Sequence, residues 1–390
     1  MASAAQENIK CDVAIVGGGL SGGLIALALA KSRPEMKVVL VEAQAKFGGN
    51  HYWSFFATDI APDDRWLTAP LVTYGWSGYE VRFPGHERKL DTIYYTIESE
   101  RLDEVLRAAL PAESLLTGCE VKSISPRLVV LKGGQRINAG GVIDARGAAD
   151  LHHLECGWQK FTGQLLQLSH PHDQAKPVIM DATVAQHDGY RFVHILPFGM
   201  DKLFIEDTYY SDTPDLDERI MKQRIAEYAR ERGWNVEGIL REEQGVLPVV
   251  MDGDLDNYWA SGSGRVAKAG ARGGFFHGVT SYVLPDAVRC AVFISQLDDL
   301  DGDRLNVTMR RRADRHWKEQ SLLRKLNRTM IRNGNPDERY KIFERLFALS
   351  PELIERFFAG VSSVADKARI LSGKPPVSVG KAIRALRKKA

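Results

Sequence analysis

The sequence predicts an α/β protein in which a domain built on a parallel sheet is interrupted by a β-rich insertion and followed by a helical region. Three observations support this fold class. A glycine-rich turn joins a buried strand to a helix near the N-terminus, strand-like runs dominate the middle of the chain, and helical periodicity begins near Arg304. The length of 390 residues suits two or three domains.

The N-terminal turn has the pattern GxGxxG, formed by Gly17, Gly19 and Gly22, between a strand at 13–16 and a helix expected at 20–30. Such glycines let the backbone approach a pyrophosphate, which the helix N-terminus then faces. Glu42 ends the next strand, where an acid binds a ribose hydroxyl. The pattern predicts a dinucleotide site; the alternative is a tight strand-to-helix turn without a ligand.

A second diglycine in FGGNHYW, at 47–53, is typical of FAD rather than NAD sites. A helix, short strands, the buried strand GVIDARG and a third glycine-rich segment at 267–288 follow in that order. This order resembles the FAD domain of the glutathione-reductase-like flavoproteins. The resemblance implies a discontinuous Rossmann FAD domain into which a substrate domain is inserted.

The expected boundaries follow from these segments. The FAD domain takes 10–50, 85–150 and 260–305, the β-rich substrate domain takes 51–84 and 151–259, and a basic helical region takes 306–390. The candidate cofactor-binding residues are Gly17, Gly19, Leu20, Gly22, Glu42, Ala43, Gly49, Asn50, Arg101, Asp144, Gly147, Gly274, Thr280 and Ser281. Arg101 is equally natural as a helix-surface residue.

The stretch LFIEDTYY, at 203–210, places two acids inside an apolar run. It pairs with GYRFVHILP across a turn, so the two segments predict a β-hairpin. Strand alternation separates Glu206 from Asp207, and one of them must point inward. A buried carboxylate is costly unless it is paired, hydrogen-bonded or neutralised. The pattern alone does not say which face is inside.

Several longer segments carry a specific resemblance. GGNHYWSF, LSHPH, IMDATV, GYRFV, IEDT, REEQGVLP and ILSGKPPV, in this order, resemble the bacterial lycopene β-cyclases, an FAD-dependent carotenoid cyclase family. The resemblance implies reduced FAD without net redox change, NAD(P)H as reductant, and conversion of lycopene through γ-carotene to β-carotene. It implies a peripheral site on the cytoplasmic side of the membrane and contact with other enzymes of the pathway. It also implies that Glu206 is the essential acid.

Cyclisation of a ψ end group begins with protonation of an alkene, which is a very poor base. The acid must therefore be neutral at neutral pH, which for a carboxyl requires an apolar site that raises its pKa. The candidates for the catalytic site are Glu206, Asp207 and Glu243. Glu206 is expected in the pocket, and Asp207, on the opposite face, is expected to be ionised and structural. Glu243 lies either near flavin and substrate or at the surface.

Aromatic faces can stabilise the cation that protonation creates. Trp53, Phe55, Tyr190 and Phe192 are candidates for this lining, and ordinary core packing is the alternative for each. The third glycine-rich segment lacks the acid that usually contacts the ribityl chain in related flavoproteins. Gly278 and Ser281 also stand where the cyclases compared tend to have Pro and Gly.

Two rival functions remain. One is an FAD-dependent prenyl reductase or hydroxylase, which would consume NAD(P)H with each turnover; the other is a non-catalytic flavoprotein that holds carotenoid at the membrane. No metal site is predicted, because the four cysteines form no CxxC and the histidines lack a recurring acid or cysteine partner.

The C-terminal region is strongly basic. Residues 304–390 contain 22 Lys and Arg against 8 Asp and Glu, whereas the rest of the chain is acidic. Apolar residues recur on one face at 342–347 and again at 353–358, next to basic residues. Basic amphipathic helices suit an anionic membrane surface, and packing on the substrate domain is the alternative. No nucleic-acid-binding module and no secretory signal is recognisable.

Overall fold

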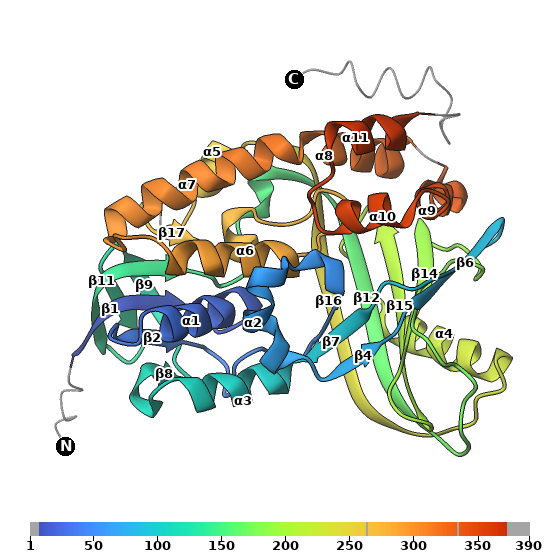
Figure 1. The fold of residues 1–390 in the computed structure, drawn as a ribbon, viewed down its shortest axis with the longest axis horizontal. Coiled ribbons are helices and arrows are strands. Elements are labelled where there is room, and N and C mark those ends of the chain that lie inside the picture. The colour runs from blue at the N-terminus through green and yellow to red at the C-terminus, as the bar shows by residue number, and fades with distance from the viewer. Residues whose placement is uncertain (1–7, 263, 334, 373–390) are drawn as a thin grey trace.

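The computed structural model describes residues 8–262, 264–333 and 335–372, in two sheet domains with helices lying across both (Figure 1). The first sheet has the order β8-β2-β1-β11-β10-β9, and β17 pairs with β11. Its strands are β1 (Ile9–Val16), β2 (Val38–Val41), β8 (Leu115–Leu116), β9 (Val121–Ser125), β10 (Leu128–Leu131), β11 (Arg136–Asp144) and β17 (Ala267–Lys268).

The central strands of the first sheet, beside the glycine-rich turn, are parallel. β1 pairs in parallel with β2 and β11, whereas β9 and β10 form an antiparallel extension. Helices α1 (Leu20–Ser32) and α6 (Leu284–Ser295) pack together over one face, with α3 (Ser99–Ala109) beside α1 (Figure 1). The second half of β1, at 13–16, and most of α1 up to Leu29 are buried, which explains their apolar runs.

The second sheet has seven strands in the order β16-β12-β15-β14-β13-β5-β6. Apart from the parallel pair β13–β5, its neighbours are antiparallel. Its strands are β5 (Tyr79–Phe83), β6 (His86–Leu90), β12 (Leu154–Leu168), β13 (Val178–Asp181), β14 (Tyr190–Pro197), β15 (Lys202–Ser211) and β16 (Val236–Gly253). β14 and β15 are the predicted hairpin. β6 belongs to this sheet, although the expected boundary at residue 85 grouped its residues with the FAD domain.

A small sheet of β3 (Tyr52–Phe56), β7 (Tyr94–Glu98) and β4 (Tyr74–Trp76) lies between the two domains (Figure 1). The outer face of the second sheet is covered by α4 (Glu218–Glu231), whose apolar residues pack on Leu203 and Ile205. The remaining helices are α2 (Arg65–Thr68), α5 (Leu255–Ala260), α7 (Gly302–Glu319), α8 (Ser321–Arg328), α9 (Tyr340–Phe347), α10 (Pro351–Phe358) and α11 (Val364–Leu371).

The apolar faces of α9 and α10 belong to the core rather than to the protein surface. Phe343, Phe347 and Phe357 are at most 3% exposed and pack in one cluster with Tyr190 and Phe204 of the second sheet. Packing on the substrate domain, one of the two readings of these faces, is therefore what the structure shows. The basic end RALRKKA, at 384–390, lies outside the described residues. Within the described ranges, no helix combines the length and apolarity needed to cross a bilayer.

Replacing Phe343 with alanine should test this packing. Its ring centroid lies 5.2 Å from that of Tyr190 and 5.8 Å from that of Tyr210, so truncation leaves a cavity under the second sheet. We expect the free energy of unfolding to fall by about 3–5 kcal/mol in denaturant titration. Val364→Ala on α11, where the side chain is 85% exposed, is the control and should change it by less than about 0.5 kcal/mol.

Candidate active site

The glycines of the N-terminal turn are required by contacts and by backbone conformation. A Cβ on Gly22 would lie 1.9 Å from the carbonyl oxygen of Gly17, and Gly17 itself has a φ of +103°. Gly19 differs, because a Cβ there would meet no atom within 4 Å. The turn is thus packed against the strand on one side and open beside the first turn of α1 on the other, which is the geometry that a pyrophosphate needs.

A cavity of about 590 Å³ opens at this turn, within the usual size range of small-molecule sites. Seven of the predicted cofactor residues line it: Gly17, Gly19, Leu20, Glu42, Ala43, Gly49 and Gly147. Further lining residues were not predicted as cofactor contacts, although some stand inside the quoted segments: Ser21, Gln44, His51, Cys119, Glu120, Val121, Arg146, Ala271 and Val283. They come from strand ends and loops that only the fold brings together. Trp53, predicted as aromatic lining for substrate, lies here instead.

Glu42 closes β2 at the edge of this cavity. Its carboxylate accepts hydrogen bonds from the backbone N–H of Gly18 and of Gln44, both at 2.8 Å. These bonds hold the acid over the glycine turn, where a ribose would lie in a dinucleotide complex. The residues therefore fit the adenosine half of an FAD molecule.

The other predicted cofactor residues lie outside the cavity lining. Asn50 donates to the carbonyl of Glu242, and Gly22 packs inside the turn. Arg101 donates to the carbonyl of Pro70 and pairs with Glu104 on the surface of α3, the alternative that the sequence left open.

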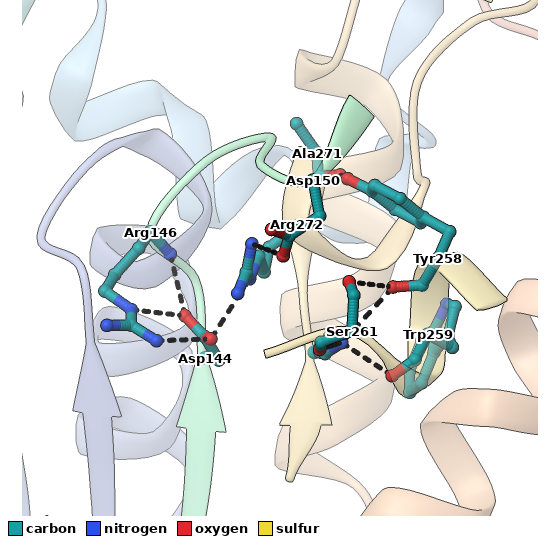
Figure 2. Close-up of polar contacts among 9 residues, drawn as sticks. Asp144, Arg146, Asp150, Tyr258, Trp259, Ser261, Ala271 and Arg272 are labelled. Atoms are coloured by element: carbon teal, nitrogen blue, oxygen red, sulfur yellow. Dashed lines mark hydrogen bonds and ion pairs between the residues drawn. The ribbon is translucent and has the colours of Figure 1, made fainter. Parts of the chain in front are cut away.

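Asp144 anchors a network at the end of β11 (Figure 2). Its carboxylate accepts two hydrogen bonds from Arg146 at 2.8 Å and one from Arg272 at 3.2 Å. Burial alone would raise the pKa of Asp144, but the two arginines hold it below its usual value. Asp144 therefore orients Arg146, which lines the cavity.

The third glycine-rich segment is fixed by its basic residues. Lys268 donates to the carbonyls of Trp259 and Ser261, and burial lowers its pKa to about 8. Arg272 pairs with Asp144 and Asp150 (Figure 2). Ala271, the residue before Arg272, lines the cavity. Gly274 ends this short helical turn with a φ of +78°. The segment therefore meets the cavity through the apolar residues Ala271 and Val283.

Ser281 has a φ of +56°, a conformation that costs a non-glycine residue about 1–2 kcal/mol. This explains why a glycine suits the position in the cyclases compared above. Here the serine hydroxyl donates to the carbonyl of Pro248 in β16 at 2.6 Å, which partly offsets the strain. Its neighbour Thr280 contacts the ring of His277. Ser281 thus joins the third segment to β16, Thr280 bonds within the segment, and neither residue lines the cavity.

A row of four residues crosses the second sheet beside this segment. In the strand register Gly163 of β12 lies between Glu243 of β16 and Glu206 of β15, and His194 of β14 lies beyond Glu206. Directly opposed residues of antiparallel strands point to the same face. The two glutamates and the histidine therefore share the face that α9 and α10 cover. Because Gly163 has no side chain, nothing separates the two acids.

The two glutamates form one hydrogen-bonded carboxyl pair. Glu206 also accepts from the hydroxyl of Thr208 at 2.6 Å, and Glu243 accepts from the N–H of Tyr52 at 2.9 Å. Burial raises the pKa of Glu206 to about 7. Burial and then the charge of Glu206 raise the pKa of Glu243 well above its usual value. The pair therefore holds a proton at neutral pH.

Glu206 keeps some accessible side-chain surface, yet its carboxyl lies deep among protein atoms. Its carboxyl therefore lies among protein atoms on the side of the sheet that α9 and α10 cover. The neighbouring Glu242 points the other way, as strand alternation requires, and pairs with Lys222 at the surface. The structure thus separates the two acids of REEQG, which the sequence could not.

Asp207 points to the opposite face of β15, under α4. Arg191 donates to its carboxylate at 2.7 Å, and the hydroxyl of Tyr209 donates at 2.5 Å. Burial raises its pKa, although Arg191 opposes that shift. Asp207 is therefore a structural partner of Arg191, and it does not share a face with Glu206 and Glu243, with which it was grouped as a catalytic candidate.

Aromatic rings surround the carboxyl pair, but they are mostly not the ones predicted. The ring of Phe204 fills the space above Gly163, where a Cβ would lie 2.3 Å from its ring carbon, and it packs 4.7 Å from Tyr52. Tyr94 meets the edge of His194 at 6.3 Å. Of the predicted candidates, Phe55 packs in the core against Tyr95.

Tyr190 and Phe192 lie further along the sheet, where Phe343 stacks on Tyr190. Alternation along β3 connects the two halves of the site: Tyr52 meets the acid pair and Trp53 lines the cavity. Among the described residues, no three His, Cys, Asp or Glu side chains gather where they could hold a metal ion.

Comparison with known sequences gives one consistent family. The family model described as "Lycopene cyclase protein" matches residues 12–384. The chain is 43% identical over 374 residues to the lycopene beta-cyclase of Pseudescherichia vulneris, with 96% of each chain covered. It is 42% identical over 376 residues to the lycopene beta-cyclase of Pantoea ananas, and the alignment covers 96% of this chain and 97% of the relative.

Solved structures with the same fold are more distant in sequence. The p-nitrophenol 4-monooxygenase of Pseudomonas putida aligns with a TM-score of 0.61 at 16% identity, over 95% of this chain and all of its own. A geranylgeranyl bacteriochlorophyll reductase-like protein of Thermoplasma acidophilum aligns with a TM-score of 0.58 at 12% identity, over 98% of this chain and 97% of its own. The predicted fold class is confirmed by these neighbours.

Replacing Glu206 with glutamine should change how the free energy of unfolding depends on pH, because the pKa of Glu206 is raised in the folded protein. Between the unfolded pKa of 4.5 and the folded pKa of about 7, the folded state binds more protons than the unfolded state. The free energy of unfolding of the parent protein therefore falls as the pH rises through this window, and glutamine removes that loss. We expect the variant to gain melting temperature relative to the parent between about pH 5 and about pH 8.

Glu242→Gln is the matched control, one residue from Glu243. Hydrogen bonds from Lys222 and Gln164 lower the pKa of Glu242, so its loss should cost a little stability at the higher pH, the opposite sign. A pH-independent difference between the parent and Glu206→Gln would contradict the assignment of a buried, protonated pair.

Proposed function

The chain belongs to the lycopene cyclase family, and from this premise we propose that it is a lycopene β-cyclase. It converts the ψ end groups of lycopene to β-ionone rings, through γ-carotene to β-carotene, by acid-initiated cyclisation without net redox change. The observation that carries the proposal is the buried Glu206–Glu243 pair. Burial raises the pKa of both carboxyls, so that protonated Glu206 can give its proton to an alkene while Glu243 keeps its own.

The carboxyl pair delivers the first proton. Glu206 protonates C2 of the terminal alkene, and the C5=C6 bond then attacks the cation at C1. Glu243 supports this step because the hydrogen bond between the two carboxyls stabilises the charge left on Glu206. Thr208 holds the same carboxylate from the other side and fixes its orientation.

The surroundings of the pair protect the cation. The rings of Tyr52, Phe204 and Tyr94 offer π faces to positive charge, and none of them is a strong nucleophile. The buried faces of α9 and α10 close the same side of the sheet, which keeps water from capturing the cation.

FAD is the cofactor that the cavity fits. The turn at Gly17 and Gly19, with Glu42 and Arg146, would hold its adenosine diphosphate, and the cavity continues to Trp53 beside the acid pair. Reduced FAD, when bound, supplies negative charge that stabilises a neighbouring cation. NAD(P)H is the proposed reductant that brings the flavin to this form.

A reductase or hydroxylase of the same fold is the rival function, and a carotenoid-holding protein is another. A hydride-transfer or oxygen-transfer enzyme has no need of a protonated carboxyl pair in an aromatic enclosure. The pair therefore favours the cyclase, and the rivals make different predictions for consumption of reductant and for Glu206.

The activity is tested in cells that accumulate lycopene. The parent protein should convert lycopene to β-carotene, and Glu206→Gln should lower the conversion by at least about 10²-fold while retaining flavin. Asp207→Asn is unsuitable as a control because it breaks a buried ion pair, so Glu242→Gln serves instead and should retain activity.

Two results would contradict the cyclase. One is unchanged lycopene with a folded, flavin-loaded parent protein. The other is consumption of one NAD(P)H for each product molecule, which would favour the reductase or hydroxylase. If Glu206→Gln had full activity in cells, the acid assignment would be wrong although the fold is correct.

The site of membrane contact is proposed to be α11. Val364 and Leu371, seven residues apart on this helix, are 85% and 52% exposed, with Arg369 nearby, and Val361 in the loop before the helix is 52% exposed. On the same helix Asp366 pairs with Arg356 of α10, which holds the helix against the protein. Apolar side chains with basic neighbours suit an anionic lipid surface, from which a hydrocarbon substrate can be taken directly.

Val364→Asp combined with Leu371→Asp should weaken binding to phosphatidylserine-containing vesicles by at least about tenfold. Each side chain would lose roughly 1 kcal/mol or more of apolar burial, and 1.4 kcal/mol corresponds to about tenfold in affinity. Vesicle flotation measures the change. Val307→Asp on α7, at 47% exposure, is the control and should bind normally. Equal binding by all three proteins would remove α11 as the contact.

A further inference from the structure

His194 ends the row of side chains that contains the acid pair. It lies directly opposite Glu206 in the pairing of β14 with β15, so the two side chains point to the same face. Its Nε2 atom is buried and has no hydrogen-bond partner among the described residues. Burial lowers the pKa of the imidazole to about 4, so the ring is neutral. A neutral ring with a free nitrogen therefore faces the space beside Glu206.

The free nitrogen contrasts with the other members of the row. Glu243 has the N–H of Tyr52, and Glu206 has the hydroxyl of Thr208. A buried polar atom without a partner costs about 1–3 kcal/mol, and native proteins rarely keep one without a reason. Met180 and Leu196 pack around this face as apolar residues and offer no better partner. Both acids of the row therefore accept hydrogen bonds, whereas the Nε2 atom of His194 has no partner among the described residues.

The reaction needs a base as close to the acid as His194 is to Glu206. After ring closure the cation lies at C5, and the proton on C6 must leave to give the β-ring. C2, which receives the first proton, and C6, which loses the last one, are both bonded to C1 in the new ring. The donor and the acceptor must therefore lie within about one ring's width of each other. Opposed residues on paired strands, with Cβ atoms about 5 Å apart, meet this requirement.

We propose that His194 is the base that takes the C6 proton at Nε2 and returns it to Glu206. The inference rests on the cyclase function proposed above. In the first step the C6–H bond breaks, its electron pair forms the C5=C6 double bond, and the proton goes to the imidazole. In the second step the imidazolium gives this proton to the Glu206 carboxylate. The acid is restored, and no oxidant or reductant is consumed.

The charges of the row favour both steps. A C–H bond next to a carbocation is a strong acid, so a neutral imidazole suffices as acceptor. By then Glu206 is a carboxylate beside it, and this charge stabilises the imidazolium. Glu243 keeps its own proton throughout and donates a hydrogen bond to the Glu206 carboxylate until the C6 proton returns, so the two carboxyls are never ionised together. The titratable groups facing His194 are therefore Glu206 from β15 and, across the ring edge, Tyr94 from β7.

The position of the base also selects the product. The C5 cation can lose a proton from C6, from C4 or from the methyl group on C5, which gives three different ring double bonds. A base fixed beside Glu206 removes only the C6 proton. Without it, the cation should lose protons from the other positions or live long enough to capture water.

The test uses His194→Gln in the full-length, flavin-loaded protein, with lycopene and with lycopene deuterated at C6 as substrates. We expect the rate of β-ring formation to fall by at least about 10²-fold. Rings with a C4=C5 or an exocyclic double bond should appear, and the C6 deuterium isotope effect should increase because C6 deprotonation becomes the slow step. Chromatography with mass and NMR identification of the rings measures both effects.

His172→Gln is the matched control, because His172 also has ring nitrogens without partners but contacts the turn between β14 and β15 through Met200. It should retain parent products and isotope effect. His194→Ala, with free imidazole added to restore β-ring formation, is the second variant in case glutamine perturbs folding.

The outcomes separate the two proposals. Parent rates, pure β-rings and an unchanged isotope effect in a folded His194 variant would overturn the role of His194 and leave the cyclase intact. Slower turnover with pure β-rings, an unchanged isotope effect and no imidazole rescue would also overturn it, since a positioning role alone predicts that result. If the parent protein itself does not cyclise lycopene, the proposed function fails instead.

Discussion

The site depends on two carboxyls that are buried side by side. Burying one carboxylate is already costly, and burying two in contact forces the pair to keep a proton. Gly163 makes the contact possible, because any side chain there would meet both the ring of Phe204 and the Glu243 side chain. Thr208 and Tyr52 donate to the pair, and the packed faces of α9 and α10 keep this side of the sheet dry. Loss of the packing on this face would let one acid ionise, because burial is what raises both pKa values, whereas the two donors lower them.

The second constraint is the connection between the acid pair and the dinucleotide cavity. Strand β3 provides it through the two-residue period of a strand, since Tyr52 and Trp53 point to opposite partners. The bond from Ser281 to Pro248 ties the third glycine-rich segment to β16, the strand that carries Glu243. Ser281, with its unfavourable φ, therefore lies at the junction of the two domains. Backbone strain of this kind is commonly found at functional sites.

The sequence predicted what local patterns encode. Glycine spacing located the cavity, and strand alternation separated Glu206 from Asp207. For α9 and α10 the sequence left membrane contact and packing on the substrate domain open, and the structure shows packing. What it could not predict depends on register. Nothing local indicates that Glu243 lies two strands from Glu206 across a glycine, or that His194 lies opposite it, because those relations arise only when β12 is placed between β16 and β15. The same holds for Arg146, whose position follows from a bidentate bond to Asp144.

Proteins of this fold carry out different reactions, and the structure suggests where such differences lie. The glycine-rich turn, Glu42 and the Asp144 network belong to the first domain, around the cavity that fits a cofactor. The residues that distinguish proton chemistry from redox chemistry stand on four strands of the second sheet, in a single row. The strand pairing at Glu206 and His194 is made by the backbone, so it does not depend on these two side chains. Similarity of fold therefore cannot distinguish a cyclase from a reductase, whereas the side chains of that row can.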